Sequence, residues 1–287
     1  MKTSSIITGL ATFVFLVVAT CPALGWGPEA HTLITLHAIA VLPDEIKPFY
    51  RTNERYVAAL VTLPDDWRET HKDTGPQHFF DLDLFDKPPF KKVRGTRKEV
   101  EKRFGKNKVL EMGLLPWTIE ERFNRLVKAM RTGNGVEIVV QSALLAHFVG
   151  DAHVPFHATK FYDGKKPEQK GLHFRWETNL VALHLKPESL KPRSPKKIEN
   201  VLSATFDWLA ASNSYVDALC EADNKAREKD PVYGYRYFAS LADYTMNILE
   251  ERLSSAATNL ASIYITAWEK AGRPKLPDKP ALLYWGH

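Results

Sequence analysis

The chain has 287 residues, of which 44% are apolar, and its 15 Gly and 18 Pro are spread without any low-complexity tract. This composition excludes a disordered or fibrous chain and predicts one globular domain with a sizeable core. The formal net charge of +5 is mildly basic.

Residues 1–25 have the pattern of a cleaved export signal. Lys2 gives a short basic start, an apolar run covers residues 10–18, and Ala23-Leu24-Gly25 has the small-x-small form of a cleavage site. The run is shorter than the roughly 20 residues that a membrane-spanning helix needs, so cleavage is favoured over a transmembrane anchor. A lipoprotein with Cys21 as the lipidated residue is a further alternative.

Cleavage after Gly25 predicts a mature domain of residues 26–287 that begins with Trp26. Removing Lys2 leaves 38 basic against 34 acidic residues, a net charge of +4. Cys220 is then the only cysteine, which excludes an internal disulfide, and no Asn-x-Ser/Thr acceptor occurs. These features favour a bacterial protein that is located in the periplasm or secreted.

Helical spacing of apolar residues dominates the mature chain, whereas strand-like alternation is nearly absent. We therefore predict an all-α fold with a single multi-helix domain. The expected helices cover residues 29–42, 53–63, 119–131, 136–153, 174–185, 198–212 and 216–229. Residues 235–271 keep helical spacing throughout and form either one long helix or two.

A long connection, residues 64–117, separates the second and third expected helices. Its section 87–108 contains ten Lys or Arg against two Glu. Such a run is usually a solvated loop, but it also predicts possible contact with an anionic polymer or an anionic lipid surface.

Two short segments concentrate residues that ligate zinc. His147 and Asp151 are four residues apart, as are His173 and Glu177, so each pair projects from one face of a helix. Val154-Pro155 breaks the first helix and brings His157 back toward the pair. Any one such pair is more often an ion pair than a metal site.

The order of the metal-ligating residues along the chain is more specific than any pair. Local motifs are Trp-Gly-Pro-Glu-Ala-His at 26–31, Pro-Asp-Asp-Trp-Arg at 64–68, Gln-His-Phe-Phe-Asp at 77–81, Ala-His-Phe-Val-Gly-Asp-Ala-His-Val-Pro-Phe-His at 146–157 and Gly-Leu-His-Phe-Arg-Trp-Glu at 171–177. The series resembles the ligand set of the superfamily of zinc-dependent phospholipases C and single-strand-specific nucleases of fungi and plants. The matching residues are Trp26, His31, Asp65, His78, His147, Asp151, His157, His173 and Glu177.

The resemblance implies a three-zinc cluster in a cleft between helices. Asp65, His78, His147 and Asp151 would hold one metal, and His157, His173 and Glu177 another. The third would use the amino nitrogen and carbonyl oxygen of Trp26, His31 and bridging Asp151. An α-amino group ligates zinc only once processing has freed it, so the precursor should be inactive.

The implied chemistry is hydrolysis of a phosphodiester bond by a metal-activated hydroxide. Asp65 would orient or deprotonate the attacking water, and Arg68 would stabilise charge in the transition state. The alternative for Arg68 is a surface ion pair with an acid such as Asp66.

Two substrate classes, single-stranded nucleic acid and phospholipid, compete. Phe79 and Asp81 resemble the nuclease pocket, in which an aromatic ring stacks on a base and a carboxylate bonds to its edge. Core packing of Phe79 and helix N-capping by Asp81 are the structural alternatives. Glu177 instead matches the phospholipase pattern, and Tyr162-Asp163-Gly164 replaces the Gly-Gly-Asn element typical of the nucleases. We favour the nuclease, because the pocket residues contact substrate directly.

Other functions have less support. A non-catalytic exported zinc-binding module would not need Asp65 and a complete ligand set. A zinc protease lacks its His-Glu-x-x-His segment. No obligate protein partner is evident. The remaining histidines are assigned no metal, and His153 is expected to make a hydrogen bond near the site or in the core.

Overall fold

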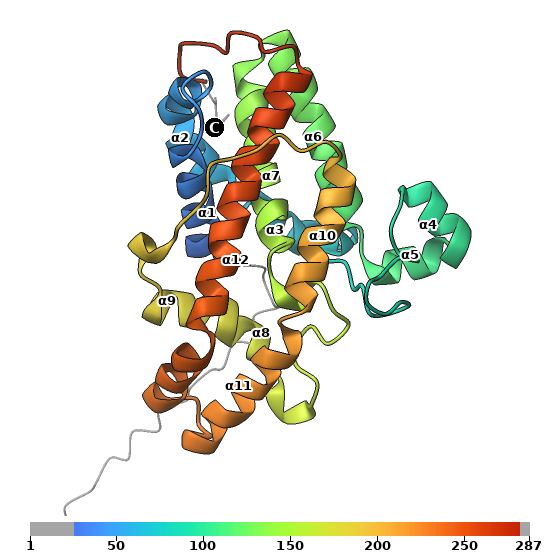
Figure 1. Ribbon diagram of the computed structural model, residues 1–287, viewed down its shortest axis with the longest axis vertical. Coiled ribbons are helices and arrows are strands. Elements are labelled where there is room, and N and C mark those ends of the chain that lie inside the picture. Colours follow the sequence, from blue (N-terminus) through green and yellow to red (C-terminus); the bar gives the residue numbers. More distant parts are fainter. Residues whose placement is uncertain (1–25, 282–287) are drawn as a thin grey trace, which may run out of the picture.

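The computed structural model describes residues 26–281, and its regular elements in this range are helices (Figure 1). The one extended pairing among them is an isolated bridge between Tyr162 and Gly164. The all-α prediction is therefore confirmed. None of the described helices has both the length and the apolar character that crossing a bilayer requires. The predicted signal at residues 1–25 lies outside the described residues.

The longer helices are those expected from apolar spacing, with shifted ends. They are α1 (Pro28–Ala40), α2 (Lys47–Leu60), α6 (Leu115–Thr132), α7 (Gly135–Asp151), α10 (Val201–Asn213), α11 (Val216–Lys229) and α12 (Tyr235–Lys270). α2 and α6 start earlier than predicted because Pro48 and Pro116 occupy first-turn positions. Proline is tolerated there, because a backbone N–H in the first turn has no partner within the helix. α10 starts later, at the cap formed by Asn200, whose side chain accepts from the Ser203 amide.

α12 is one uninterrupted helix of 36 residues, which decides between the two alternatives for this segment. It runs the length of the molecule (Figure 1) and contacts α1, α6, α7 and α11. α7 lies inside the bundle, and nearly all of its residues from Ile138 to Asp151 are buried. A helix that is enclosed on all sides can carry ligands into a dry interior, and this is the helix that holds His147 and Asp151.

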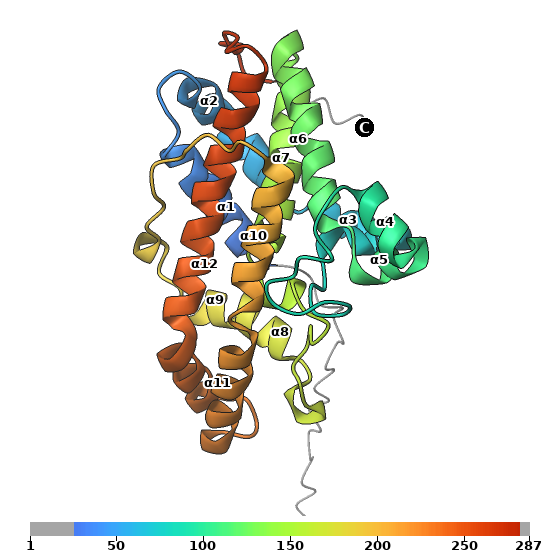
Figure 2. The ribbon, with the colours of Figure 1, turned by 45° about the vertical axis from the view of Figure 1, so that its right-hand side comes forward.

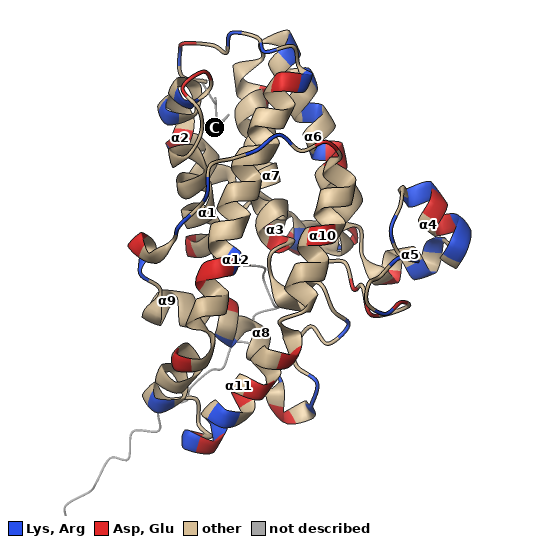
Figure 3. Cartoon of the chain, viewed as in Figure 1, with Lys and Arg blue, Asp and Glu red and all other residues tan. Residues whose placement is uncertain are grey.

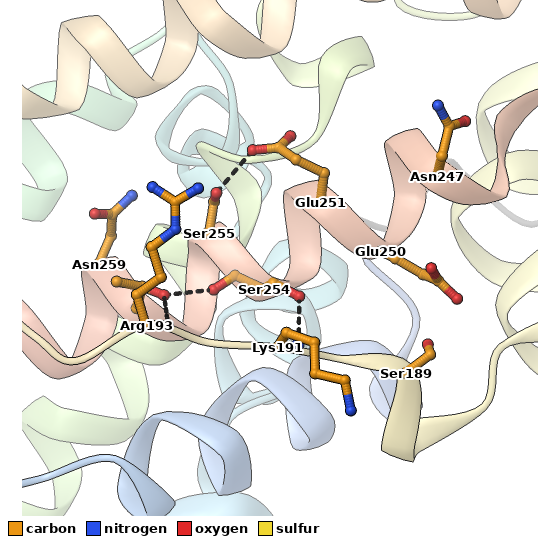
Figure 4. Close-up of a pocket in the computed structure, with 10 residues that line it drawn as sticks. Ser189, Lys191, Arg193, Asn247, Glu250, Glu251, Ser254, Ser255 and Asn259 are labelled. Carbon is orange, nitrogen blue, oxygen red and sulfur yellow. Dashed lines mark hydrogen bonds between the residues drawn. The ribbon is translucent and has the colours of Figure 1, made fainter.

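An extended segment, residues 190–200, is fastened along α12 by a row of hydroxyls. The backbone amides of Lys191, Arg193, Lys196 and Ile198 donate to Ser254, Thr258, Ser262 and Thr266 at 2.9–3.0 Å. These hydroxyls recur every four residues and so lie on one face of the helix. Figure 4 shows part of this seam, which lines a polar surface pocket of about 420 Å³. The row satisfies amides that have no strand partner.

The long connection at residues 64–117 is largely helical. It contains α3 (Leu63–Thr70), the 3₁₀ helix η1 (Lys72–His78), α4 (Arg97–Phe104) and α5 (Lys106–Met112). Its section 87–108, expected to be a solvated loop, includes α4 and the start of α5. α4 begins with a complete capping box, in which Thr96 and Glu99 bond to each other's backbone amides. α4 and α5 pack on each other beside the main bundle (Figure 2), and η1 contacts both α3 and α5. Local capping thus gives helices where charge content indicated a loop.

The segment predicted as one helix at 174–185 is a composite. It consists of α8 (Leu172–Phe174), the π-helical turn η4 (Arg175–Asn179) and α9 (Leu180–His184). Short 3₁₀ turns occur at η2 (Pro155–His157), η3 (Pro167–Gln169) and η5 (Pro187–Ser189). π-helical turns are rare in proteins, and those that occur are often at functional sites. This one contains Glu177.

Candidate metal centre

Asp151, at the end of α7, lies at the centre of a group of histidines. Its Oδ2 is 3.1 Å from Nδ1 of His78 and 3.2 Å from Nε2 of His147. Its Oδ1 is 3.6 Å from Nε2 of His31 and 3.6 Å from Nδ1 of His157. The carboxylate is fully buried, so both of its oxygens face imidazoles rather than water.

Asp65 joins this group from the first turn of α3. Its Oδ1 lies 3.7 Å from Nδ1 of His78 and 3.8 Å from Nε2 of His147. The four residues expected at the first metal, Asp65, His78, His147 and Asp151, therefore converge, although they come from three different helices.

A second group forms where the chain turns back after α7. Asp151 ends the helix, Pro155 begins the turn η2, and His157 follows. Nδ1 of His157 donates to the carbonyl oxygen of His78 at 2.7 Å, which leaves Nε2 directed toward Glu177 at 3.9 Å. Nε2 of His173 lies 2.8 Å from the same Glu177 oxygen, Oε2. The three residues expected at the second metal are thus brought together.

Trp26 and His31 pack against the same end of α7. The Trp26 indole is buried and donates to the carbonyl oxygen of Gly150 at 3.0 Å, one residue before Asp151. The His31 ring stacks on that of His147 with centroids 4.2 Å apart. The first residue of the predicted mature chain is therefore anchored beside Asp151.

Within residues 26–281, three sets of donor atoms lie close enough together to hold metal ions. In each, the ligand atoms are within 4.8 Å of one another and all residues are buried. The sets are His31, Asp65 and His147; His78, His147 and Asp151; and His157, His173 and Glu177.

The residues fit a metal on a structural criterion as well. Both ring nitrogens of His31, Oδ1 of Asp151 and both carboxylate oxygens of Glu177 are buried without a hydrogen-bond partner in the described structure. Nε2 of His173 approaches Glu177 to 2.8 Å but also lacks the alignment of a hydrogen bond. Each such group costs about 1–3 kcal/mol if it stays unpaired. Bound cations would satisfy the carboxylate oxygens and one nitrogen of each imidazole.

The pKa values of the ligand groups favour cation binding. Burial lowers the pKa of His157 to about 3 and that of His173 to about 4, so both imidazoles keep free lone pairs at neutral pH. Burial also raises the pKa of Glu177 well above its ordinary value, and Asp151 and Asp65 add repulsion. A buried carboxyl among carboxylates ionises readily only when positive charge is supplied.

A pocket of about 350 Å³ opens over this centre. Its lining residues are Arg68, His78, Phe79, Asp81, Glu111, Phe156, His157, Tyr162 and His173. All four residues proposed for catalysis or substrate binding adjoin the centre, since Arg68, Phe79 and Asp81 line the pocket and Asp65 is a member of the centre. Nη1 of Arg68 lies 3.5 Å from Oδ1 of Asp65, so the guanidinium is paired with a candidate ligand.

Backbone contacts fix the segment that carries Phe79 and Asp81. The Phe80 amide donates to the His157 carbonyl at 2.8 Å, and the Asp81 amide to the Met112 carbonyl at 2.7 Å. Gly113 has φ +102°, and a Cβ there would lie 2.1 Å from the Phe79 carbonyl oxygen, so only glycine fits.

The structural alternatives for these two side chains are not supported. Asp81 precedes a turn at residues 82–85 and no helix, so it is not a helix N-cap. Phe79 is half-buried and faces the pocket, outside the buried core. Burial, with repulsion from Asp83 and Glu111, raises the pKa of Asp81 to about 8.

Several pocket and support residues were missed at the sequence level. Glu111, Phe156 and Tyr162 line the pocket; Phe156 stands within the motif at 146–157 but was assigned no role, and Glu111 and Tyr162 lie outside the ligand motifs. Tyr162 occurs in the loop that departs from the nuclease pattern, which was the available signal. His153 behaves as expected: its Nδ1 donates to the Val149 carbonyl at 2.7 Å, and its Nε2 lies 2.9 Å from the Asn259 amide nitrogen.

A search of curated proteins gave no significant match. The family model described as S1/P1 Nuclease matches residues 26–268, a span that starts at Trp26 and includes all nine candidate ligands. Because the match covers most of the sequence, the chain belongs to the S1/P1 nuclease family.

Proposed function

We propose that the protein is a zinc-dependent nuclease that hydrolyses phosphodiester bonds in single-stranded DNA or RNA. The observation that carries the proposal is the convergence of three buried ligand sets beneath one pocket whose wall includes Phe79 and Asp81. Family membership supports the nuclease over the phospholipase.

The donor chemistry supports zinc as the metal. Imidazole nitrogens with a few carboxylate oxygens suit zinc, whereas calcium and magnesium prefer oxygen ligands alone. Asp65, His78, His147 and Asp151 would hold one ion, His157, His173 and Glu177 a second, and Trp26, His31 and Asp151 a third. Bound zinc would lower the pKa of water and neutralise phosphate oxygens.

Asp65 and Arg68 are the proposed catalytic side chains. Asp65 is about 8% exposed within the metal centre, where its carboxylate can accept a hydrogen bond from the attacking water and orient it. Arg68 extends from the same helix into the pocket and can place its charge beside the phosphate oxygens as negative charge develops. Neither role requires a covalent intermediate.

Phe79 and Asp81 are the proposed base-binding pair. A half-buried ring at the pocket wall can stack on one base, and stacking requires a base that is free of its complementary strand. With a pKa of about 8, Asp81 carries its proton near neutrality and can both donate to and accept from a base edge. This arrangement supports the preference for single strands.

Export is part of the proposal. Residues 1–25 would be removed, and the mature protein would act in the periplasm or outside the cell. The family match starts at Trp26, which supports this boundary. Cys220 is buried and unpaired, so oxidation to an internal disulfide is not needed for export.

The test is hydrolysis by the mature protein, beginning at Trp26, with zinc. Single-stranded DNA, single-stranded RNA and phosphatidylcholine would be compared. Zinc-dependent cleavage of nucleic acid, lost in Asp151→Ala, is expected. Phosphocholine release without cleavage of nucleic acid would instead identify a phospholipase, and no turnover on any substrate would favour the non-catalytic module.

A matched pair of variants isolates the role of Asp65. Asp65→Asn keeps the size of a side chain at the metal centre, whereas Asp66→Asn makes the same change at the exposed neighbouring position. We expect the first to lower kcat at least about 100-fold and the second to leave it unchanged. Equal effects would remove Asp65 from the mechanism.

A further inference from the structure

The basic segment 87–108, here called the basic arm, is the most strongly charged part of the chain. It comprises the loop before α4, α4 itself and the first half of α5. Ten Lys or Arg stand against two Glu in these 22 residues. The arm lies to one side of the main bundle (Figure 2), and its basic residues cover α4 and the adjoining chain (Figure 3).

The arm is held in a defined shape. Nε1 of Trp117 donates to the Gly95 carbonyl at 3.0 Å, and the Arg103 guanidinium bonds to the carbonyl oxygens of Lys92 and Arg94. Val100 and Val109 are buried beneath its two helices. The positive charges are therefore presented on a preorganised surface, which reduces the entropy lost on binding.

Much of the charge on the arm is not neutralised within the protein. Arg94 pairs with Asp207, and Arg97 pairs with Glu101. Among the described residues, seven exposed lysines of the arm make no ion pair: Lys87, Lys91, Lys92, Lys98, Lys102, Lys106 and Lys108. Like charges gathered at this density attract a polyanion.

The arm adjoins the pocket over the candidate metal centre. α5 continues from Lys108 to Glu111, three residues on, and Glu111 lines that pocket. The next residue, Met112, accepts the hydrogen bond of the Asp81 amide. A strand with one nucleotide in the pocket can therefore continue directly onto the arm.

We propose that the basic arm binds the sugar–phosphate backbone of a polynucleotide whose scissile nucleotide occupies the pocket. This inference rests on the proposed nuclease function and extends it to substrate length. Contact with phosphates is independent of sequence and adds affinity only for strands long enough to reach the arm. The enzyme should therefore favour long strands over dinucleotides.

A membrane surface fits the arm less well than nucleic acid does. A helix that binds a bilayer surface presents a broad apolar face beside its basic face. Here the valines of α4 and α5 point inward, and Leu110, just beyond the arm, is the one large apolar side chain of the two helices that is exposed, at 49%.

The test compares two triple variants of the zinc-loaded protein. The arm variant carries three substitutions in the basic arm: Lys98→Glu, Lys102→Glu and Lys106→Glu. The control triple makes the same charge change at exposed lysines elsewhere: Lys186→Glu, Lys196→Glu and Lys279→Glu. Values of kcat/KM would be measured over a range of salt concentrations for a single-stranded oligonucleotide of about 20 nucleotides and for a dinucleotide.

The arm variant should lose about tenfold or more of its kcat/KM on the long strand at low salt. The slope of log kcat/KM against log salt should become shallower by roughly 2, since each lost phosphate contact removes about 0.7. Cleavage of the dinucleotide should stay within about twofold of wild type, and the control triple should resemble wild type on both substrates.

Three results would overturn the proposal. They are equal losses on both substrate lengths, an arm variant indistinguishable from the control triple, or unchanged nucleic-acid cleavage with lost sedimentation on vesicles of phosphatidylserine and phosphatidylcholine. The last would assign the arm to a membrane. If wild type cleaved neither nucleic-acid substrate, the nuclease function itself would fail, and the arm proposal with it.

Discussion

The His31 ring lies directly against Gly150, at a distance that leaves no room for a side chain. A Cβ built on Gly150 would be 2.7 Å from Nδ1 of His31 and 2.9 Å from its Cε1. Gly150 also accepts the Trp26 indole hydrogen bond through its carbonyl oxygen. This glycine of α7 thus sets the distance between the helix and two proposed ligands of the third metal.

Gly150→Ala should weaken metal binding without unfolding the protein. The new methyl group displaces His31, and disturbing the surroundings of a ligand typically costs 10–100-fold in metal affinity or activity. Alanine meanwhile favours the helix by about 1 kcal/mol over glycine. Bound zinc per chain and kcat/KM would be measured alongside the melting temperature of the metal-free protein.

Gly135→Ala is the matched control in the same helix. A Cβ at Gly135 would make only ordinary contacts, with Cγ and Cβ of Pro277 at 3.5 and 3.8 Å and Cε2 of Phe49 at 3.9 Å. We expect this variant to keep wild-type zinc content and activity. If Gly150→Ala also kept both, His31 would not depend on the close approach to α7.

Asp81 should make stability depend on pH. Its pKa is about 8 in the folded protein against an ordinary value of 3.8, so between about pH 4 and 8 the folded state holds a proton that the unfolded state has lost. The free energy of unfolding contributed by Asp81 therefore falls as pH rises through this window. Asp81→Asn removes that loss, and the variant should gain in melting temperature over wild type from pH 4 to 8, then remain level.

The melting temperatures would be measured with a chelator present, because a bound cation adds its own charge to the pocket. Asp243→Asn, at an exposed position of α12, serves as the control. A difference between Asp81→Asn and wild type that did not change from pH 4 to 8 would show that Asp81 is ionised throughout.

Sequence patterns predicted which candidate ligands converge better than they predicted the surfaces around them. Four-residue spacing on a helix fixes which side chains share a face. The sequence therefore predicted that His147 lies beside Asp151 and His173 beside Glu177. The π-helical turn around Glu177 was not foreseen, because apolar spacing does not distinguish such a turn from an α-helix. The defined shape of the basic arm could not be predicted either. The loop before α4 is held by a hydrogen bond from the Trp117 indole to the Gly95 carbonyl, which lies 22 residues earlier in the chain.

The hydroxyl row of α12 shows the same limit of local patterns. Ser254, Thr258, Ser262 and Thr266 read locally as poor helix formers. Their role emerges only when residues 190–200 lie across them and donate amides to them. The donors in residues 190–200 are backbone amides, so these long-range hydrogen bonds produce no periodic pattern of side chains in that segment.

Arg175 should be a major contributor to stability around the second ligand set. It is about 8% exposed, its Nη2 lies 3.1 Å from Oδ1 of Asp223, and its Nε donates to the Tyr237 hydroxyl at 3.0 Å. Arg175→Met leaves the buried Asp223 carboxylate with the Tyr237 hydroxyl at 2.6 Å and only a 3.7 Å contact to the Arg227 guanidinium, and loss of one member of a buried ion pair costs about 3–5 kcal/mol. Chemical denaturation of the zinc-loaded protein measures the loss.

The surface pair of Arg125 and Glu121 provides the comparison for Arg175. Its atoms are only 2.6 Å apart, but both side chains are more than half exposed. Arg125→Met should therefore cost less than about 1 kcal/mol. Similar losses for the two variants would mean that burial adds nothing to the Arg175 pair.

The free amino group of Trp26 should be required for full activity. A protein that retains Gly25 has an amide nitrogen at residue 26, which cannot donate a lone pair to zinc, whereas the indole bond to Gly150 and the packing on Trp176 can persist. We expect bound zinc to fall from three ions toward two and kcat/KM to fall about 10–100-fold, with little change in the melting temperature of the metal-free protein.

Trp26→Phe in the processed chain makes the opposite change, because it keeps the amino group and loses the indole donor. A milder loss is expected there, and full activity of the Gly25-extended protein would show that the third site forms without the amino terminus.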